Sequence, residues 1–309
     1  MSIDAASIKA RSLELGFLAC GITDTTAMPH AAELDQWLAK GYGGTMRYLH
    51  RQAARRKEPA LIAREAKSVV VLLDNYLPAE QAAEAGPRIA KYARGRDYHL
   101  DLVERLDLLA LWLRERGATF TRVFADAGPV PERELAQRAG LGWIGKNTML
   151  IRPDAGSFFF IGSIFTDLDI AADLPFEADR CGTCTRCLDA CPTSAFVAPR
   201  VLDATRCISY LTIEYRGDFP EDAKGLSGWA FGCDVCNDVC PWNVSFARPT
   251  ANPAYQVRER PESDPDFYDE MTEDEFTRRY QDTPLSRPGL AGMRRNWRAA
   301  LASTQRSQE

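Results

Sequence analysis

Cysteines dominate the middle of this chain and restrict what it can fold into. Eight of its nine cysteines lie between residues 181 and 240, in two runs that each end in Cys-Pro. The first run is Cys181-x2-Cys184-x2-Cys187-x3-Cys191-Pro192, the bacterial ferredoxin spacing in which the fourth cysteine binds the other of two clusters. The second run is Cys233-x2-Cys236-x3-Cys240-Pro241, with Cys207 upstream. Eight thiolates are what two 4Fe–4S clusters need, so the pattern predicts an electron-transfer module.

The spacing also predicts which cysteines share a cluster. Two intervening residues place successive sulfurs at neighbouring corners of one cluster. We expect the cysteine before proline to lie on a short helix that points its sulfur at the other cluster. We therefore expect one cluster to be bound by Cys181, Cys184, Cys187 and Cys240. We expect the second cluster to be bound by Cys191, Cys207, Cys233 and Cys236. Cys207 is irregular, because 25 residues (208–232) separate it from Cys233 and add a loop beside this cluster.

Zinc and disulfides are the alternative uses of so many cysteines. Zinc sites usually contain Cys-x2-Cys pairs that lie farther apart, and disulfides need an oxidising compartment. Residues 1–16 lack the pattern of a signal peptide, and the chain has no apolar run of about 18 residues. We expect a cytoplasmic protein with no membrane contact, in which the isolated Cys20 is a small buried hydrophobic residue.

Charge is unevenly distributed along the 309 residues, whose net charge is −5. Basic residues concentrate in 45–67 and 88–96, whereas 263–275 carries seven acids and no base. Arg294, Arg295 and Arg298 return positive charge near the C-terminus. Local basic patches are enough to bind nucleic acid phosphates, but solvated surface faces give the same pattern, so charge leaves both interpretations open.

The periodicity of apolar residues predicts an α/β or α+β fold for the N-terminal part. Helices are predicted over 4–15, 98–116 and 131–139, and strands over 68–73, 119–125 and 158–165. We expect three units: a domain over 1–175, a ferredoxin-like two-cluster domain over 176–250, and a helical tail over 251–309 that ends in a basic helix over 292–303.

Several stretches together resemble the epoxyqueuosine reductase family, over roughly residues 5–250. They are residues 92–99 (Tyr-Ala-Arg-Gly-Arg-Asp-Tyr-His), 126–134, 139–148, 191–195 and 206–212. The resemblance implies a cobalamin-dependent enzyme with two 4Fe–4S clusters that converts epoxyqueuosine to queuosine in the anticodon loop of tRNA. It implies that the N-terminal domain holds the corrinoid against the ferredoxin-like module, and that an external flavodoxin or ferredoxin system supplies electrons. We expect a monomer, truncated relative to members that continue into a helical-repeat domain.

The same resemblance implies site residues. Asp126 is implied as the proton donor to the leaving oxygen; because a carboxylic acid must be protonated to donate, we expect burial to raise its pKa. The position of Asp126 before Gly128-Pro129 also suits a turn or helix cap. Further implied cofactor contacts are Arg56, Lys146, Asn147, Ser157, Ser209 and Asp234. Arg216 is implied as a contact to tRNA phosphate. Each of these residues also has an ordinary structural alternative in surface solvation, loop hydrogen bonding or hydrogen bonding to cluster sulfur.

Two other features and two rival functions complete the prediction. Gly140-x4-Gly145-Lys146 lacks the Ser or Thr of a phosphate-binding loop. Asp97-x-His99 begins a cobalt-binding pattern whose glycine is absent, because Leu102 occupies that position. The rival functions are a different corrinoid reductase, such as a reductive dehalogenase, and a plain electron carrier. The long α/β part ahead of the cysteines argues against a plain carrier.

Overall fold

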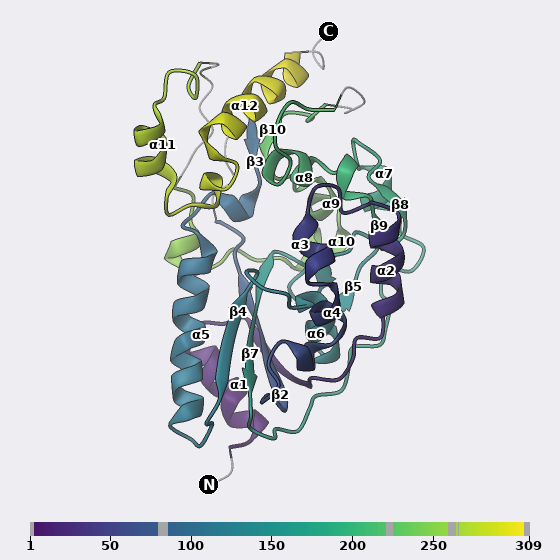
Figure 1. Ribbon diagram of the computed structural model, residues 1–309, viewed down its shortest axis with the longest axis vertical. Coiled ribbons are helices and arrows are strands. Elements are labelled where there is room, and N and C mark those ends of the chain that lie inside the picture. Colours follow the sequence, from purple (N-terminus) through teal and green to yellow (C-terminus); the bar gives the residue numbers. More distant parts are fainter. Residues whose placement is uncertain (1–2, 80–85, 221–224, 259–263, 265, 306–309) are drawn as a thin grey trace.

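An antiparallel sheet forms the centre of the N-terminal part of the protein (Figure 1). The computed structural model describes residues 3–79, 86–220, 225–258, 264 and 266–305. The sheet order is β1-β2-β7-β4, and every neighbouring pair runs antiparallel. Its strands are β1 (Ala19–Asp24), β2 (Ser68–Asn75), β4 (Thr121–Ala125) and β7 (Phe159–Thr166). The protein is therefore of mixed α and β structure with an antiparallel sheet, which is the α+β form of the prediction.

Both faces of this sheet are covered, which explains why β2 is apolar without a break. Val69, Val71 and Leu73 face one core, which also contains residues of α6 (Glu132–Arg138). Val70 and Leu72 face a second core made with α1 (Ala5–Glu14) and α5 (Tyr98–Arg114). Successive side chains of a strand point to opposite faces, so a strand covered on both sides needs apolar residues at every position.

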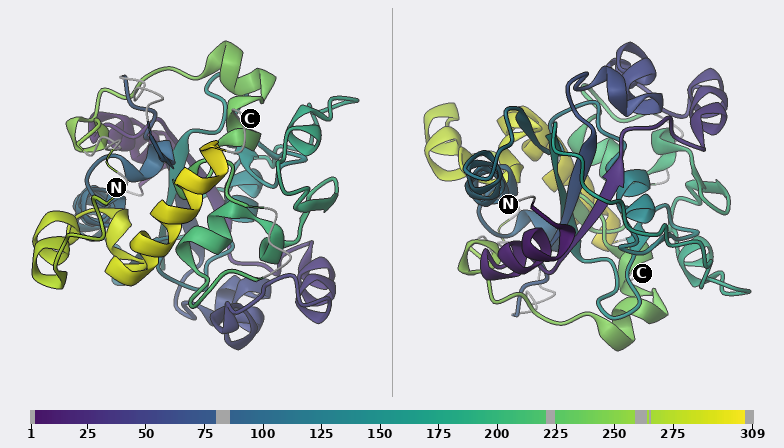
Figure 2. Two further views of the ribbon diagram at one scale, coloured as in Figure 1. Left: turned by 90° about the horizontal axis from the view of Figure 1, so that it is seen from above. Right: turned by 90° about the horizontal axis from the view of Figure 1, so that it is seen from below.

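The predicted helices and strands form close to their expected bounds. α1 (Ala5–Glu14) is capped by Asp4, whose side chain accepts from the Ser7 N–H at 2.9 Å. α5 (Tyr98–Arg114) is capped by Asp97, and its buried leucines pack in the second core. Figure 2 shows the helices that flank the sheet from above and below. The remaining elements before the cysteines are α2 (Ala31–Ala39), α3 (Arg47–Arg51), α4 (Ala53–Lys57), η1 (Pro59–Leu61), β3 (Arg88–Ile89), η2 (Lys91–Ala93), β5 (Trp143–Ile144) and β6 (Leu150–Ile151).

The cysteine-bearing part consists of short elements joined by turns. They are α7 (Arg186–Asp189), β8 (Phe196–Ala198), β9 (Val201–Leu202), η3 (Ala204–Arg206), α8 (Ile208–Ile213), β10 (Trp229–Phe231), α9 (Val235–Asp238) and α10 (Pro241–Phe246). Cys240 is the N-cap of α10, with Pro241 in its first turn, as the Cys-Pro pattern predicts. The first run differs, because no helix follows Cys191 and Pro192 lies in a turn. β10 pairs in parallel with β3, so this part is joined to the N-terminal part by a small sheet.

The C-terminal part packs on that small sheet through its own apolar core. It contains η4 (Pro253–Tyr255), α11 (Glu273–Tyr280), η5 (Pro284–Ser286) and α12 (Gly289–Gln305). Trp297 of α12 is 1% exposed and belongs to a core shared with Ile89 and Phe231. The acidic run has a local role here, because Thr272 and Glu275 form a capping box at the start of α11.

The arginines of the predicted basic helix are largely used inside the chain. Arg294 donates to the carbonyl oxygens of Tyr268 at 2.9 Å and Met271 at 2.6 Å. Arg295 donates to the carbonyl oxygens of Leu211 and Gly217. These bonds tie α12 to neighbouring segments, which favours the structural interpretation of this charge. Within the described residues, no helix is both long and apolar enough to cross a membrane.

Gly21 in β1 offers a test of how α6 is seated on the sheet. A Cβ at this position would overlap with the carbonyl oxygen of Ala139, the residue that follows α6. We expect Gly21→Ala to lower the free energy of unfolding by about 1–3 kcal/mol, because the backbone of one element must shift. Urea denaturation followed by circular dichroism measures this change. An unchanged midpoint would show that the two elements are not in close contact.

Candidate active site

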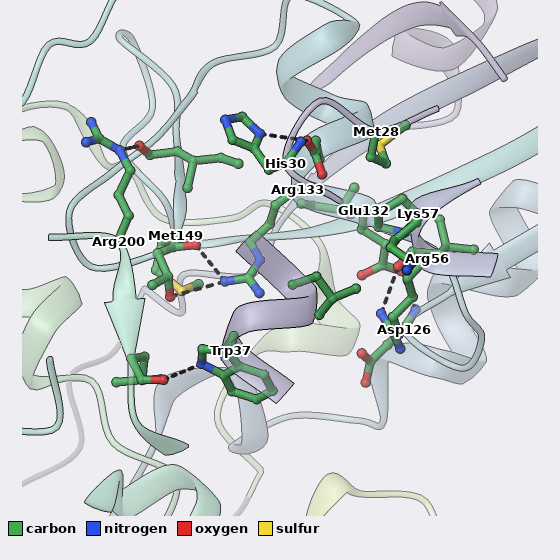
Figure 3. A pocket seen from close by; sticks show the side chains of 18 of the residues that line it. Met28, His30, Trp37, Arg56, Lys57, Asp126, Glu132, Arg133, Met149 and Arg200 are labelled. Carbon is green, nitrogen blue, oxygen red and sulfur yellow. Dashed lines mark hydrogen bonds and ion pairs between the residues drawn. The ribbon is translucent and has the colours of Figure 1, made fainter. Parts of the chain in front are cut away.

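A cavity of about 620 Å³ lies where β4 ends and β7 begins (Figure 3). Its apolar wall includes Val130, Met149 and residues 159–161 of β7. Its polar residues come from several elements: Arg56, Tyr98, Asp126, Glu132, Arg133 and Arg200. Figure 3 shows Asp126 and Arg56 at one end of this cavity and Arg200, from the β8–β9 hairpin of the cysteine-bearing part, at the other. The cavity therefore borders both the sheet and the cysteine-bearing part.

Asp126 occupies an unusual backbone position directly after β4. Its φ of 54° lies in the left-handed region, which aspartate tolerates better than most residues. From there its carboxylate meets the first turn of α5. Tyr98 Oη donates to Asp126 Oδ2 at 2.6 Å, and His99 Nε2 lies 3.6 Å from the same oxygen. The structure thus brings Asp126 into contact with two groups that hold protons, and Asp126 is not a helix cap.

His99 lies between two carboxylates. Its Nδ1 is 2.7 Å from Asp97 Oδ1, and its Nε2 faces Asp126. Burial alone would lower the pKa of His99, but Asp126 and Asp97 outweigh burial and raise this pKa to about 9. His99 is therefore an imidazolium at neutral pH, with a proton directed at Asp126.

The expected direction of the Asp126 pKa is wrong in this structure. His99 lowers the pKa of Asp126 below its usual value, against the opposing effect of burial, and the Tyr98 hydroxyl lowers it further. Burial raises this pKa, but the combined effect of His99 and Tyr98 is larger. Charge and hydrogen bonding decide the protonation state here: Asp126 is a carboxylate, and the ready proton is on His99.

Glu132 is the carboxyl group of this site that burial keeps protonated. Its Oε1 accepts the backbone N–H of Asp126 at 2.7 Å. Burial raises the pKa of Glu132, and the negative charge of Asp126 raises it further. Glu132 therefore holds the backbone of the loop that carries Asp126 without adding a second charge at the same place.

Arg56 braces the same loop. Its Nη1 donates to the Val130 carbonyl at 3.2 Å and its Nη2 to the Gly128 carbonyl at 3.1 Å. Its Nε is buried and has no hydrogen-bond partner within the described part of the chain. Arg56 lines the cavity, and its buried Nε is a donor available to a bound group.

The first predicted cysteine set comes together around a second cavity of about 310 Å³. Cys181, Cys184, Cys187 and Cys240 all line it. Trp143 Nε1 donates to Cys181 Sγ at 3.4 Å. Lys146 Nζ donates to the carbonyl oxygens of Gly182 at 2.7 Å and Cys184 at 3.0 Å, so Lys146 supports the turn of these cysteines. We call these four cysteines set A.

The second predicted set, Cys191, Cys207, Cys233 and Cys236, is called set B. Burial raises the pKa of Cys233 to about 12, and nearby Cys207 and Cys191 add to the effect. Burial likewise raises the pKa of Cys236, with Cys233 and Cys207 adding to it. The thiols of set B therefore lie close enough to one another to affect each other's pKa.

All nine cysteines are free thiols. No group of three His, Cys, Asp or Glu side chains within the described residues is spaced for a single metal ion. A four-iron cluster holds its ligand sulfurs farther apart than one ion does, and converging thiols are the ligands that it requires. The donor sets therefore fit 4Fe–4S clusters. Cys20 is partly buried in β1 rather than fully buried, and burial raises its pKa to about 12.

The other predicted cofactor contacts do not line the 620 Å³ cavity. Asn147 Nδ2 donates to the Cys236 carbonyl at 3.3 Å, and the buried Ser157 bonds to Asn243. The buried Asp234 accepts the Lys91 backbone N–H at 2.7 Å. Ser209 donates to Cys207, which matches the alternative of a hydrogen bond to cluster sulfur. The contacts of Asn147, Ser157 and Asp234 join the N-terminal part to the cysteine-bearing part.

Arg216 is exposed and donates to the carbonyl oxygens of Ile213 at 2.6 Å and Arg287 at 2.9 Å.

Sequence reasoning missed Tyr98 and Glu132, and it weighed His99 only as a cobalt ligand. The available signal was the position of Tyr98 and His99 in the first turn of a predicted helix, where the Asp97 cap fixes their direction.

Two family models match parts of the chain. Residues 180–243 match the family described as a 4Fe-4S double cluster binding domain. Residues 56–127 match the family described as epoxyqueuosine reductase QueG, DUF1730. Together with the sheet and its cysteine-bearing part, these matches define an iron–sulfur oxidoreductase.

Curated relatives and solved structures agree. The epoxyqueuosine reductase of Cellulophaga algicola is 41% identical over 299 residues, covering 94% of this chain and 95% of that one. The Pseudomonas aeruginosa epoxyqueuosine reductase is 42% identical over 310 residues, covering 97% and 85%. An epoxyqueuosine reductase solved with a tRNA-Tyr epoxyqueuosine-modified stem loop superposes with a TM-score of 0.88 at 28% identity, covering 98% of this chain and 82% of that one. The chain belongs to the epoxyqueuosine reductase family.

A further solved structure also superposes on this chain. The Bacillus subtilis epoxyqueuosine reductase, with a TM-score of 0.87 and 28% identity over 98% of this chain and 82% of that one, was solved with an aspartate-bearing catalytic loop swung out of its active site.

Proposed function

We propose that this chain reduces epoxyqueuosine to queuosine in the anticodon loop of tRNA. The reaction consumes two electrons and two protons, breaks the epoxide carbon–oxygen bonds and releases the oxygen as water. The observation that carries the proposal is the cluster of Asp126, Tyr98 and His99 in a cavity that borders both the sheet and the cysteine-bearing part. Membership of the epoxyqueuosine reductase family supports it.

We propose that the 620 Å³ cavity, which Asp126 and Arg56 line, holds cobalamin. Val130, Met149 and residues 159–161 offer the apolar wall that a corrin ring needs. The unpartnered Nε of Arg56 offers a donor to the ring's carboxamide oxygens. Bound cobalamin would supply two-electron reducing chemistry at its cobalt, whereas the protein orients the group and handles the protons.

Set A and set B are proposed to bind one 4Fe–4S cluster each. The clusters would pass electrons one at a time from an external donor toward the 620 Å³ cavity. The Trp143 N–H is directed at a set A sulfur, and Ala195 N–H is directed at Cys191 Sγ at 3.3 Å. Such hydrogen bonds raise the reduction potential of a bound cluster by stabilising negative charge on sulfur. The division of the chain into a cobalamin domain, a two-cluster domain and a tail stays a prediction.

The proton for the leaving oxygen is proposed to come from His99 through Asp126. In this step the His99 Nε2–H bond breaks and a proton joins Asp126 Oδ2. Asp126 then donates that proton to the oxygen released from the substrate. Tyr98, which donates to Asp126 Oδ2, fixes the carboxylate between His99 and the cavity. At neutral pH the proton is on His99 and Asp126 is its unprotonated acceptor, because the pKa of His99 is raised and that of Asp126 is lowered. Transfer to Asp126 alone is therefore uphill, and the leaving oxygen, a much stronger base than a carboxylate, draws the proton onward through Asp126.

The tRNA is proposed to contact the surface that carries Arg216. This side chain is exposed, and its carbonyl contacts hold it beside Arg287. The contact reaches the backbone carbonyl of Arg287, whose own guanidinium is paired with Glu214. The exposed guanidinium of Arg216 suits a phosphate of an anticodon loop.

The experiment that tests the function uses the holoenzyme and tRNA carrying epoxyqueuosine. Under anaerobic conditions with a strong chemical reductant, we expect nucleoside mass spectrometry to record the loss of one oxygen from the modified base. Absence of product from a preparation with intact clusters and bound cobalamin would contradict the proposal.

The protonation of His99 gives a prediction on stability. A raised pKa means that the charged histidine stabilises the fold fully below its unfolded pKa of about 6.5. That stabilisation is lost as pH rises through the folded pKa of about 9. We expect His99→Gln to be less stable than the wild type at about pH 6 and nearly equal above about pH 10. The difference should stay below about 1 kcal/mol, because the side chain is 36% exposed. Urea unfolding at both pH values measures it, and a difference that does not change with pH would contradict the assignment.

A further inference from the structure

α10 exposes large apolar side chains next to set A. Val244 is 70% exposed and Phe246 is 41% exposed, on a helix that begins directly after Cys240. Phe246 and Trp242 also line the 310 Å³ cavity that set A surrounds. The half-exposed Phe246 therefore lies beside the cysteines of set A, and Val244 adds exposed apolar surface on the same short helix.

The rim of this apolar group is positively charged. Arg180 lines the same cavity, and its guanidinium lies 5.4 Å from the centre of the Phe176 ring. Arg248 donates to the carbonyl oxygens of Ser245 at 3.1 Å and Ala247 at 2.9 Å. Among the ion pairs formed by the described residues, neither Arg180 nor Arg248 has a carboxylate partner. Both charges are thus available to a partner.

In the described part of the chain, two cysteines of set B are more enclosed. Cys207 and Cys233 pack against the core that contains Ile208 and Trp229. Electrons from a protein donor have the shorter route where set A meets the surface, because electron transfer needs close approach of the two centres.

We propose that Val244, Phe246, Arg180 and Arg248, which we call the α10 patch, form the docking surface for a small acidic one-electron carrier protein. The inference rests on the proposed function and names the place where its electrons enter. Each encounter would oxidise the reduced carrier by one electron and deliver that electron to the cluster that set A would hold. Two encounters supply the two electrons that, with two protons, convert epoxyqueuosine to queuosine and water.

The charges decide the kind of partner. A small apolar centre with a charged rim is typical of transient electron-transfer contacts, whose association rate depends on complementary charge. An arginine rim attracts an acidic surface and repels a basic one. The α10 patch therefore fits an acidic carrier.

The test is a pair of opposite changes at Val244, whose 70% exposure means that neither should disturb the fold. Holoenzyme is mixed anaerobically with a purified acidic flavodoxin in its hydroquinone form, and the semiquinone absorbance is followed by stopped flow at low salt. We expect Val244→Asp to slow the second-order rate severalfold and Val244→Lys to raise it. We expect the double variant Arg180→Glu/Arg248→Glu to slow it by about tenfold and to weaken its dependence on salt.

Two controls separate docking from other effects. Arg116→Glu changes an exposed arginine beyond the end of α5, far from α10 in the fold (Figure 1), and should leave the rate unchanged. Reduction by dithionite, which needs no docking surface, should be equal in all variants. Equal flavodoxin rates for both Val244 variants would overturn the α10 patch. Loss of dithionite-driven conversion of tRNA in the wild type would instead overturn the proposed function.

Discussion

Asp126→Asn is expected to lower the rate of epoxyqueuosine reduction by about 10²- to 10⁴-fold, the range that general acid–base groups supply. The amide has nearly the shape of the carboxylate and still accepts the Tyr98 hydroxyl through its oxygen. It cannot take the proton of His99 and pass it on. The loop should keep its position, because Arg56 and Glu132 hold its backbone rather than the Asp126 side chain.

Single-turnover conversion of epoxyqueuosine tRNA with a chemical reductant measures this effect. Iron content and cobalamin absorbance of the same preparation show whether the cofactors are retained. Asp154→Asn is the matched control, because this carboxylate is 67% exposed and pairs with Arg152 outside the cavity lining. A rate for Asp126→Asn within about twofold of the wild type would remove Asp126 from proton transfer.

Cys207→Ser is expected to abolish turnover by removing one ligand of set B. Cys207 lies far from the second run in sequence, so the assignment is the strictest test of the predicted ligand sets. Loss of the set B cluster should reduce the iron content from about eight to about four atoms per chain. Electrons supplied to set A would then have no route to the cavity.

Cys20→Ser is the matched control for this experiment. Cys20 lies in β1, among apolar residues on the face of the sheet covered by α1 and α5. Its serine variant should keep the full iron content and the wild-type rate. Full iron content in Cys207→Ser would show that another residue completes set B.

The cysteine pattern predicted more of the site than any other feature. Fixed spacing constrains where thiols point, and the set A cysteines surround one cavity as expected. The helices over 4–15 and 98–116 were also predictable, because their caps and apolar stripes are local properties of the sequence.

The proton chemistry was not predictable from local sequence. The pKa of Asp126 depends on His99, which is 27 residues earlier in the chain and reaches it only because α5 packs beside β4. Burial was the only effect visible in sequence, and it acts in the opposite direction. The expectation was wrong because the charge and hydrogen bonding of His99 and Tyr98 outweigh burial at this carboxylate.

The family resemblance likewise predicted which residues belong to the site, but not which groups they contact. Lys146 and Asn147 lie in the expected loop, yet their donors reach carbonyl oxygens of the cysteine-bearing part. Arg294 and Arg295 are basic residues whose bonds close the C-terminal core. Such contacts depend on tertiary packing, which neither charge runs nor motif spacing specifies.

The requirement for cobalamin tests the central claim most directly. Chain with both clusters assembled is supplied with reductant and epoxyqueuosine tRNA, either with cobalamin or without it, and nucleosides are measured by mass spectrometry after a single turnover. We predict conversion to queuosine only where cobalamin is present. Equal conversion without cobalamin, or none when cobalamin and clusters are both bound, would contradict the account.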